Sequence, residues 1–127
     1  MDIQCATAAT VQREEGYSMR RLFPWRERVD TPWGSAWIVI PPGGQTPPHW
    51  HDEEETFVIM SGAGAMTVDG ETKHVTKGDV VYLPRCSIHV LRNTDTSEQL
   101  EMLCIWWGGD ERTVNRDVPC EPALADS

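Results

Sequence analysis

The sequence has few basic residues, no long apolar run and no convincing helical pattern. Its 127 residues contain 11 lysines and arginines against 20 aspartates and glutamates, which gives a formal net charge of −9. An acidic chain repels nucleic acid and anionic membrane surfaces, so we expect neither as a partner. The longest apolar stretch, Met102–Trp107, is far too short to span a membrane. A chain of this length is expected to form one domain.

Cysteines are also sparse and widely spaced. Cys5, Cys86, Cys104 and Cys120 include no C-x-x-C pair and form no dense framework. This spacing argues against a cysteine zinc site and favours four reduced thiols in a cytoplasmic protein. Residues 1–15 lack an apolar segment, and a signal peptide is therefore not expected.

The sequence does contain a series of short strand signals, separated by turns rich in glycine and proline. Strands are expected at residues 33–40, 55–61, 64–68, 72–75, 80–83, 88–92 and 100–107, with an edge strand near 18–23. Asp69-Gly70 is typical of a type I′ turn and predicts a hairpin. The pattern predicts an all-β, antiparallel barrel of the jelly-roll type over residues 31–110. Residues 1–30 are expected to form an N-terminal arm, and residues 111–127 a C-terminal tail.

Three of the four histidines have spacings that fit a single metal site together with one glutamate. His49 and His51 lie two residues apart on a predicted extended segment, so their side chains point to the same face. Glu55 has the same parity, and His89 must arrive from another strand. Three neutral imidazoles and one carboxylate suit zinc, iron, nickel, manganese or copper, with positions left open for water or substrate. A single histidine is more often an ordinary surface or core residue, but this constellation favours a metal site.

These residues stand in two segments that resemble the two motifs of the cupins. The first motif, G(X)5HXH(X)3–4E(X)6G, is matched by Gly43, His49, His51, Glu55 and Gly62. The second, G(X)5PXG(X)2H(X)3N, is matched by Gly78, Pro84, His89 and Asn93, with Cys86 in place of the middle glycine. Because glycine serves where φ is positive, Cys86 is an unfavourable substitute at that turn.

The cupin resemblance covers about residues 33–107. It implies a double-stranded β-helix barrel that binds one divalent metal ion per chain. Zinc or iron is expected, and manganese or nickel is also compatible. The implied ligands are His49, His51, Glu55 and His89.

Strand parity predicts which side chains line the barrel interior. If Glu55 points inward, Phe57 shares its face, and Leu91 shares the face of His89. On the last strand, parity alone does not decide whether Met102, Cys104 and Trp106 or the alternate residues point inward. Tryptophan is mainly expected to pack the barrel, although a ring with one N–H donor also suits a pocket wall. The predicted pocket residues are Trp37, Phe57, Leu91, Met102, Cys104 and Trp106.

Three residues shortly before His89 are the candidate catalytic residues. Tyr82 is a candidate proton donor, and Arg85 is expected to guard the pocket entrance. Cys86 is interpreted either as an extra thiol near the pocket or as a plain turn residue.

Cupins include dioxygenases, isomerases, decarboxylases and lyases, so the fold does not select a reaction. A narrower resemblance is carried by residues 52–62, 78–84 and 105–109. These segments look like the small cupins associated with methionyl-tRNA-synthetase-like enzymes in hydrazine synthetases. The resemblance implies such a partner enzyme, zinc as the metal, and a small-molecule substrate. The implied reaction rearranges an aminoacyl ester of an N-hydroxylated amine to form an N–N bond.

Three alternative functions stay open at the level of the sequence. A non-haem iron dioxygenase would need Fe(II) and O₂. A metal-containing binding module would bind a small molecule without turnover. A structural barrel with a vestigial site is disfavoured because all four ligand positions are filled. In each case a homodimer is expected, because small barrels often cover their exposed sheet edges by dimerising.

Overall fold

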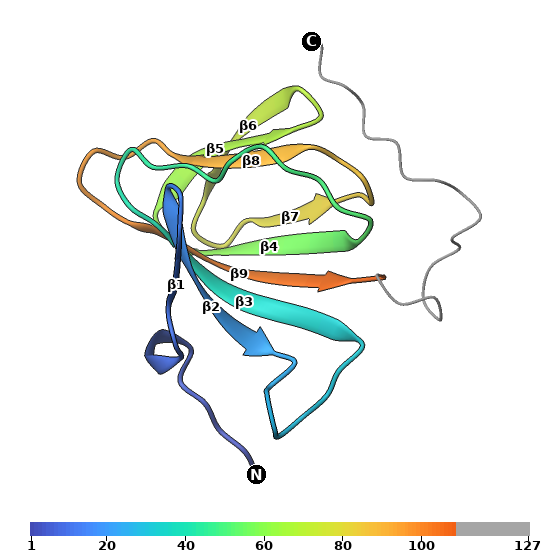
Figure 1. The fold of residues 1–127 in the computed structure, drawn as a ribbon. Helices are drawn as coiled ribbons and strands as arrows, with labels where there is room; N and C mark the ends of the chain where they lie inside the picture. The colour runs from blue at the N-terminus through green and yellow to red at the C-terminus, as the bar shows by residue number, and fades with distance from the viewer. Residues whose placement is uncertain (109–127) are drawn as a thin grey trace.

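The computed structural model describes residues 1–108, which fold into two antiparallel sheets (Figure 1). The larger sheet has the strand order β1-β2-β3-β9-β4-β7, and the smaller sheet has the order β6-β5-β8. A short 3₁₀ turn, η1 (Ala6–Ala8), precedes the strands. The strands are β1 (Gln12–Glu14), β2 (Tyr17–Phe23), β3 (Trp33–Ile40), β4 (Glu54–Ser61), β5 (Ala63–Val68), β6 (Glu71–Thr76), β7 (Val80–Leu83), β8 (His89–Asn93) and β9 (Leu100–Trp107). The predicted all-β jelly-roll barrel is confirmed.

The strands agree with the sequence pattern, and the larger sheet extends further toward the N-terminus than the pattern indicated. β3, β7 and β9 begin and end at the predicted residues. β1 pairs with β2, and β2 pairs with β3, so part of the predicted N-terminal arm belongs to the sheet. The predicted tail, residues 111–127, lies outside the described residues. Within residues 1–108, none of the secondary structure is a helix long and apolar enough to cross a membrane.

The Asp69-Gly70 turn has the conformation that its sequence predicts. Asp69 has a φ of 47° and Gly70 a φ of 84°, and positive φ at both central residues is the mark of a type I′ turn. The turn joins β5 to β6, and Ala63 to Val68 pair in register with Thr76 to Glu71. The predicted hairpin is therefore confirmed.

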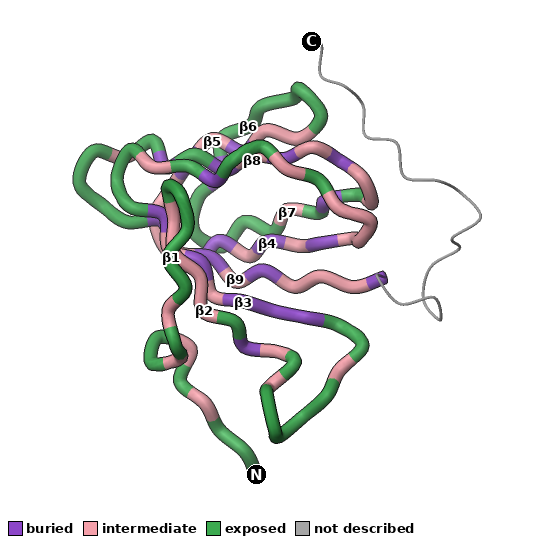
Figure 2. The backbone as a smooth tube through the Cα atoms, viewed as in Figure 1, coloured by how far each residue is buried: buried purple, intermediate pink, exposed green. Residues whose placement is uncertain are grey.

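The hydrophobic core lies on the inner faces of the two sheets, where alternate residues are buried (Figure 2). On β3 these are Ala36, Ile38 and Ile40, which pair across the sheet with residues of β9. The β9 residues Leu100, Met102 and Cys104 are almost fully buried. Parity left the inner face of this strand undecided, and the structure assigns these three residues to the interior.

Cys86 occupies the turn between β7 and β8 and has a φ of 71°, the left-handed conformation in which the motif uses glycine. Cys86 is disulfide-bonded, so the prediction of a reduced thiol is wrong at this position. Spacing along the chain did not indicate this bond because disulfide formation depends on distance in the fold. Cys5 and Cys104 are free thiols, as predicted. Cys120 lies outside the described residues.

Asn93, the last residue of the second motif, ties three segments of backbone together. Its side-chain amide donates to the carbonyl oxygens of Ile40, at 2.9 Å, and Glu98, at 2.8 Å, and its Oδ1 accepts from the N–H of Asp95 at 2.9 Å. The side chain is 1% exposed, so the loss of these bonds leaves buried backbone groups without partners.

We expect Asn93→Ala to lower the free energy of unfolding by about 1–3 kcal/mol. Urea denaturation followed by tryptophan fluorescence measures this change. Thr94→Ala is the matched control, since Thr94 is the exposed neighbour of Asn93. Equal stability of the two variants would show that the Asn93 bonds do not stabilise the fold.

Candidate metal centre

The two motif segments are hydrogen-bonded directly to each other. The backbone N–H of His89 donates to the carbonyl of His49 at 3.1 Å, and the N–H of His49 donates back at 3.4 Å. These bonds form an isolated antiparallel bridge between the two residues. The N–H of Cys86 donates to the carbonyl of His51 at 3.0 Å, which fixes the other end of the first segment. These backbone hydrogen bonds therefore fix the relative positions of the two segments that carry the three histidines.

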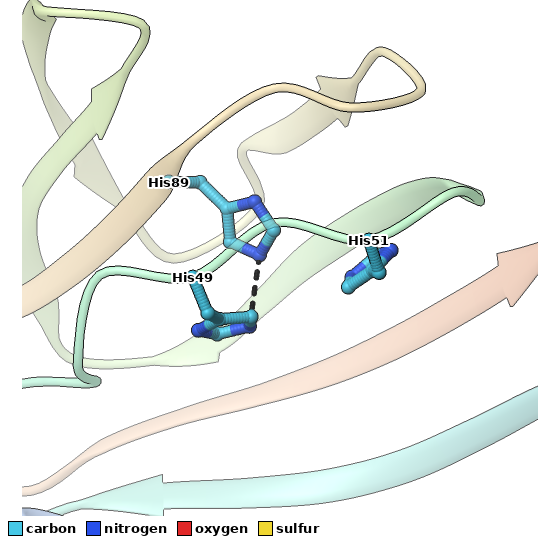
Figure 3. Close-up of side chains that lie close together, drawn as sticks. All are labelled: His49, His51 and His89. Carbon is cyan, nitrogen blue, oxygen red and sulfur yellow. Dashed lines mark hydrogen bonds between the residues drawn. The ribbon is translucent and has the colours of Figure 1, made fainter. Parts of the chain in front are cut away.

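The imidazoles of His49, His51 and His89 turn toward one another (Figure 3). One nitrogen from each ring lies within 4.8 Å of the corresponding nitrogens of the other two rings. The Nε2 atoms of His49 and His89 are 3.1 Å apart. His89 is only 1% exposed, whereas His49 and His51 are half-buried. The structure therefore brings together the three histidines that the spacing predicted.

Hydrogen bonds to the backbone fix which nitrogen of two rings is free. Nδ1 of His49 lies 2.8 Å from the carbonyl oxygen of Pro47, and Nδ1 of His89 lies 3.2 Å from that of Ser87. A carbonyl oxygen only accepts, so each Nδ1 carries the proton and donates. In the neutral rings both Nε2 atoms then present lone pairs to the same point. This is the arrangement in which backbone partners orient histidines for a metal ion.

Glu55 lies beside the histidines and is 6% exposed. Its Oε1 lies 3.1 Å from Nε2 of His51 and 3.5 Å from Nε2 of His89. The hydrogen bond with Glu55 raises the pKa of His51. Burial and, to a lesser extent, the neighbouring His49 lower the pKa of His89 to about 4, so His89 is neutral at physiological pH.

These observations test whether the residues fit a metal ion. The Nδ1 atom of His51 is buried and has no hydrogen-bond partner among the described residues. The Nε2 lone pairs of His49 and His89 face each other, and a buried carboxylate lies within 3.5 Å of His89. Nitrogen and carboxylate donors that converge in this way suit a divalent transition metal. The donor set therefore fits one such ion.

Five of the six predicted pocket residues belong to the hydrophobic core or pack against it. Phe57 packs the edge of its ring against His89, with ring centroids 5.8 Å apart. Leu91, Met102 and Cys104 are buried in the same core, and Trp106 packs against it. Trp106 is also the direct cross-strand neighbour of Glu55. Burial raises the pKa of the Cys104 thiol, which makes it a neutral wall residue rather than a nucleophile.

The structure does not bring Trp37 to this group. Trp37 lies on the face of β3 opposite Ala36 and Ile38, whose side chains are in the core. Its indole Nε1 is buried and has no hydrogen-bond partner among the described residues. Trp37 was predicted as a pocket residue, but the strand has apolar residues on both faces, and the core takes the face of Ala36 and Ile38.

The three candidate catalytic residues also lie outside the group of histidines. Tyr82 is 55% exposed, and its hydroxyl donates to Glu54 at 2.5 Å. Arg85 forms an ion pair with Asp52, the residue that follows His51. Cys86 contacts the first motif segment through its backbone N–H, which donates to the carbonyl oxygen of His51. The role of Arg85 as a guard of the entrance stays a prediction, whereas Tyr82 lies on the exposed face of β7.

Sequence reasoning missed the inward-facing residues of β2. Met19 and Arg21 pair with Ile38 and Ala36, whose side chains face the interior. Tyr17 and Met19 pack against the core, and the guanidinium of Arg21 lies over the Trp106 ring. The alternation of Tyr17, Met19 and Arg21 could have indicated that these residues share one face of a strand. It does not show with which strand β2 pairs.

Comparison with known proteins supports the same fold. A family model described as a cupin domain matches residues 36–106. The plu4264 protein from Photorhabdus luminescens is 31% identical, with a TM-score of 0.76 over 86% of this chain and 90% of that chain. A Cupin 2 conserved barrel domain protein from Salinispora arenicola CNS-205 is 34% identical, with a TM-score of 0.76 over 91% of this chain and 94% of that chain.

Curated relatives match over a shorter segment. The uncharacterized protein MJ1618 of Methanocaldococcus jannaschii is 37% identical over 70 residues, which are 54% of this chain and 55% of that protein. An uncharacterized protein of Aquifex aeolicus is also 37% identical, over 48% of its own length. The chain thus spans about half the length of these curated relatives.

Proposed function

Because the chain belongs to the cupin domain family, we propose that it is a metal-dependent enzyme that acts on a small molecule inside the barrel. The observation that carries this proposal is the convergence of three imidazoles beside the buried carboxylate of Glu55. We assign His49, His51, Glu55 and His89 as the ligands of one divalent ion, with zinc as the first choice and iron as the second. The ion would act as a Lewis acid toward a substrate oxygen.

The protein residues around the site have two tasks. Phe57, Leu91 and Met102 are buried apolar residues that exclude water from the inner end of the site. The hydrogen bonds from His49 and His89 to backbone carbonyls hold their rings in one tautomer and orientation. The hydrogen bonds keep the donor atoms in place when a substrate binds.

For the reaction itself we propose rearrangement of an aminoacyl ester of an N-hydroxylated amine. The support is the resemblance of residues 52–62, 78–84 and 105–109 to the cupins of hydrazine synthetases. In this step the amine nitrogen of the aminoacyl group attacks the hydroxylamine nitrogen, and an N–N bond forms. The N–O bond breaks, its electron pair goes to the carboxylate oxygen, and the attacking nitrogen loses a proton. The step needs no external oxidant.

The test combines the zinc-loaded protein with a matching methionyl-tRNA-synthetase-like enzyme, ATP, an N-hydroxylated amine and an amino acid. If both reacting nitrogens are ¹⁵N, the product is expected to show ¹⁵N–¹⁵N coupling by NMR and the mass of a hydrazine. The His89→Ala variant is expected to lose hydrazine formation, whereas His74→Ala, at an exposed histidine on β6, retains it.

Two outcomes would contradict this proposal. Ester formation without hydrazine, with zinc-loaded wild-type protein, would reject the rearrangement. A strict requirement for Fe(II), with oxygen uptake in the presence of substrate, would replace the rearrangement with dioxygenase chemistry at the same residues.

A further inference from the structure

We propose that Arg21 binds a carboxylate group of the ligand at the mouth of the barrel, next to the metal site. This inference rests on the proposed function, because it assumes that a small molecule enters the barrel interior. It adds a class of substrate, a carboxylate-bearing molecule, and a residue that recognises it.

The pairing of the strands directs Arg21 toward the interior. Arg21 pairs with Ala36, Ala36 pairs with Cys104, and Cys104 pairs with Phe57. The last three side chains belong to the core, and residues directly opposite in a sheet point to the same face. Arg21 thus ends a row of inward-facing side chains that crosses four strands.

Trp106 connects Arg21 to the proposed metal ligands. The guanidinium carbon of Arg21 lies 5.3 Å from the centroid of the Trp106 ring. Trp106 stands between Gly34 and Glu55 in the sheet. A Cβ on Gly34 would lie 2.3 Å from Cε2 of the indole, so the ring rests directly against the glycine backbone. A guanidinium held over a fixed ring is preorganised, and its N–H groups, which lie in the guanidinium plane, are left free to bind a ligand.

Arg21 has no ionic partner of its own among the described residues. The ion pairs of residues 1–108 use Arg28 and Arg85 as their arginines. Arg21 is exposed, although it faces the barrel, so an anion in solution can reach it. A guanidinium presents parallel N–H donors that match the two oxygens of a carboxylate.

Arg21 lines a cavity of about 890 Å³, and Arg26 lines the same cavity. A second cavity, of about 330 Å³, lies against Trp106 and Gly34, and Glu53 lines it. Glu55 lies on the other side of Trp106. Two arginines on one cavity favour an anionic group such as a carboxylate as the ligand. In the proposed rearrangement the ester becomes a carboxylate, so a site of this kind would also hold the product.

The experiment titrates zinc-loaded protein with 4-fluorobenzoate and follows the ¹⁹F NMR signal, with 4-fluorobenzamide as the uncharged match. We expect Arg21→Gln to weaken benzoate binding about tenfold or more, the effect of losing a charge-assisted bidentate contact. The benzoate affinity of Arg21→Lys is expected to lie between those of the wild type and Arg21→Gln, because an ammonium keeps the charge but lacks the planar pair of N–H donors. The indole N–H signal of Trp106, identified by its loss in Trp106→Phe, is expected to shift with benzoate in the wild type.

Arg13→Gln is the matched control, since it removes the same charge from an exposed position on β1. Equal benzoate affinity of Arg21→Gln and Arg13→Gln would overturn the proposal, as would no benzoate binding by the wild type or stronger competition by inorganic phosphate. The hydrazine assay tests the proposed function separately. If no hydrazine forms but benzoate binding still depends on Arg21, the reaction is rejected and the carboxylate site is kept. If hydrazine forms but benzoate binding does not depend on Arg21, only the carboxylate site is rejected.

Discussion

The His89→Ala variant is expected to lose bound zinc almost completely. His89 is the most buried of the three histidines, and its Nε2 lies 3.1 Å from Nε2 of His49 and 3.5 Å from Glu55. Alanine at this position removes the donor that links the two motif segments. Since even the loss of a residue that only supports a ligand costs about 10–100-fold in metal affinity, the loss of a ligand is expected to cost more.

Elemental analysis after dialysis measures the zinc content, and thermal unfolding with and without zinc measures its effect on stability. Wild-type protein is expected to hold about one ion per chain, and zinc at about 1,000 times its Kd would stabilise the fold by about 4 kcal/mol. His74→Ala is the control, because His74 is exposed on β6 and lies outside the group of three histidines. Zinc retained in His89→Ala, or no zinc bound by reconstituted wild-type protein, would contradict the assigned site.

The grouping of the three histidines could be predicted because most of their arrangement depends on local rules. His49 and His51 share a face through the period of an extended chain, and only His89 required a long-range contact. The structure provides that contact as a two-bond bridge between His49 and His89. The hairpin at Asp69-Gly70 was predictable for the same reason, since the conformation of a two-residue turn depends on the turn residues themselves.

Other features depend on which strand lies beside which, and local patterns do not contain that information. Period-two alternation divides a strand into two faces without showing which face is inside. Trp37 on β3 was therefore predicted to line the pocket, although it lies on the face opposite the core. On β9 the inner face was decided only by pairing with β3 and β4. Arg21 was missed because its position over Trp106 requires β2 to join the sheet next to β3, across a connection with no regular pattern.

Phe57→Ala is expected to lower the free energy of unfolding by about 3–5 kcal/mol, the usual cost of removing a buried phenylalanine ring. Phe57 is 3% exposed and lies on β4, next to the edge of the larger sheet, between Cys104 of β9 and Val81 of β7. Its ring also meets that of His89 at 82° with centroids 5.8 Å apart, so it fills space directly behind the proposed metal site. Phe57→Leu leaves a smaller cavity and is expected to cost less.

Urea denaturation of metal-free protein isolates the packing effect of Phe57, and Val80→Ala, at a position 66% exposed on the edge strand β7, is the control. Repeating the titration with saturating zinc separates packing from metal binding. Because Phe57→Ala removes no ligand atom, zinc is expected to stabilise this variant, whereas it is not expected to stabilise His89→Ala. A Phe57→Ala protein as stable as Val80→Ala would show that the ring is not part of a packed core. Loss of the zinc effect would show that the ring itself holds His89 in position.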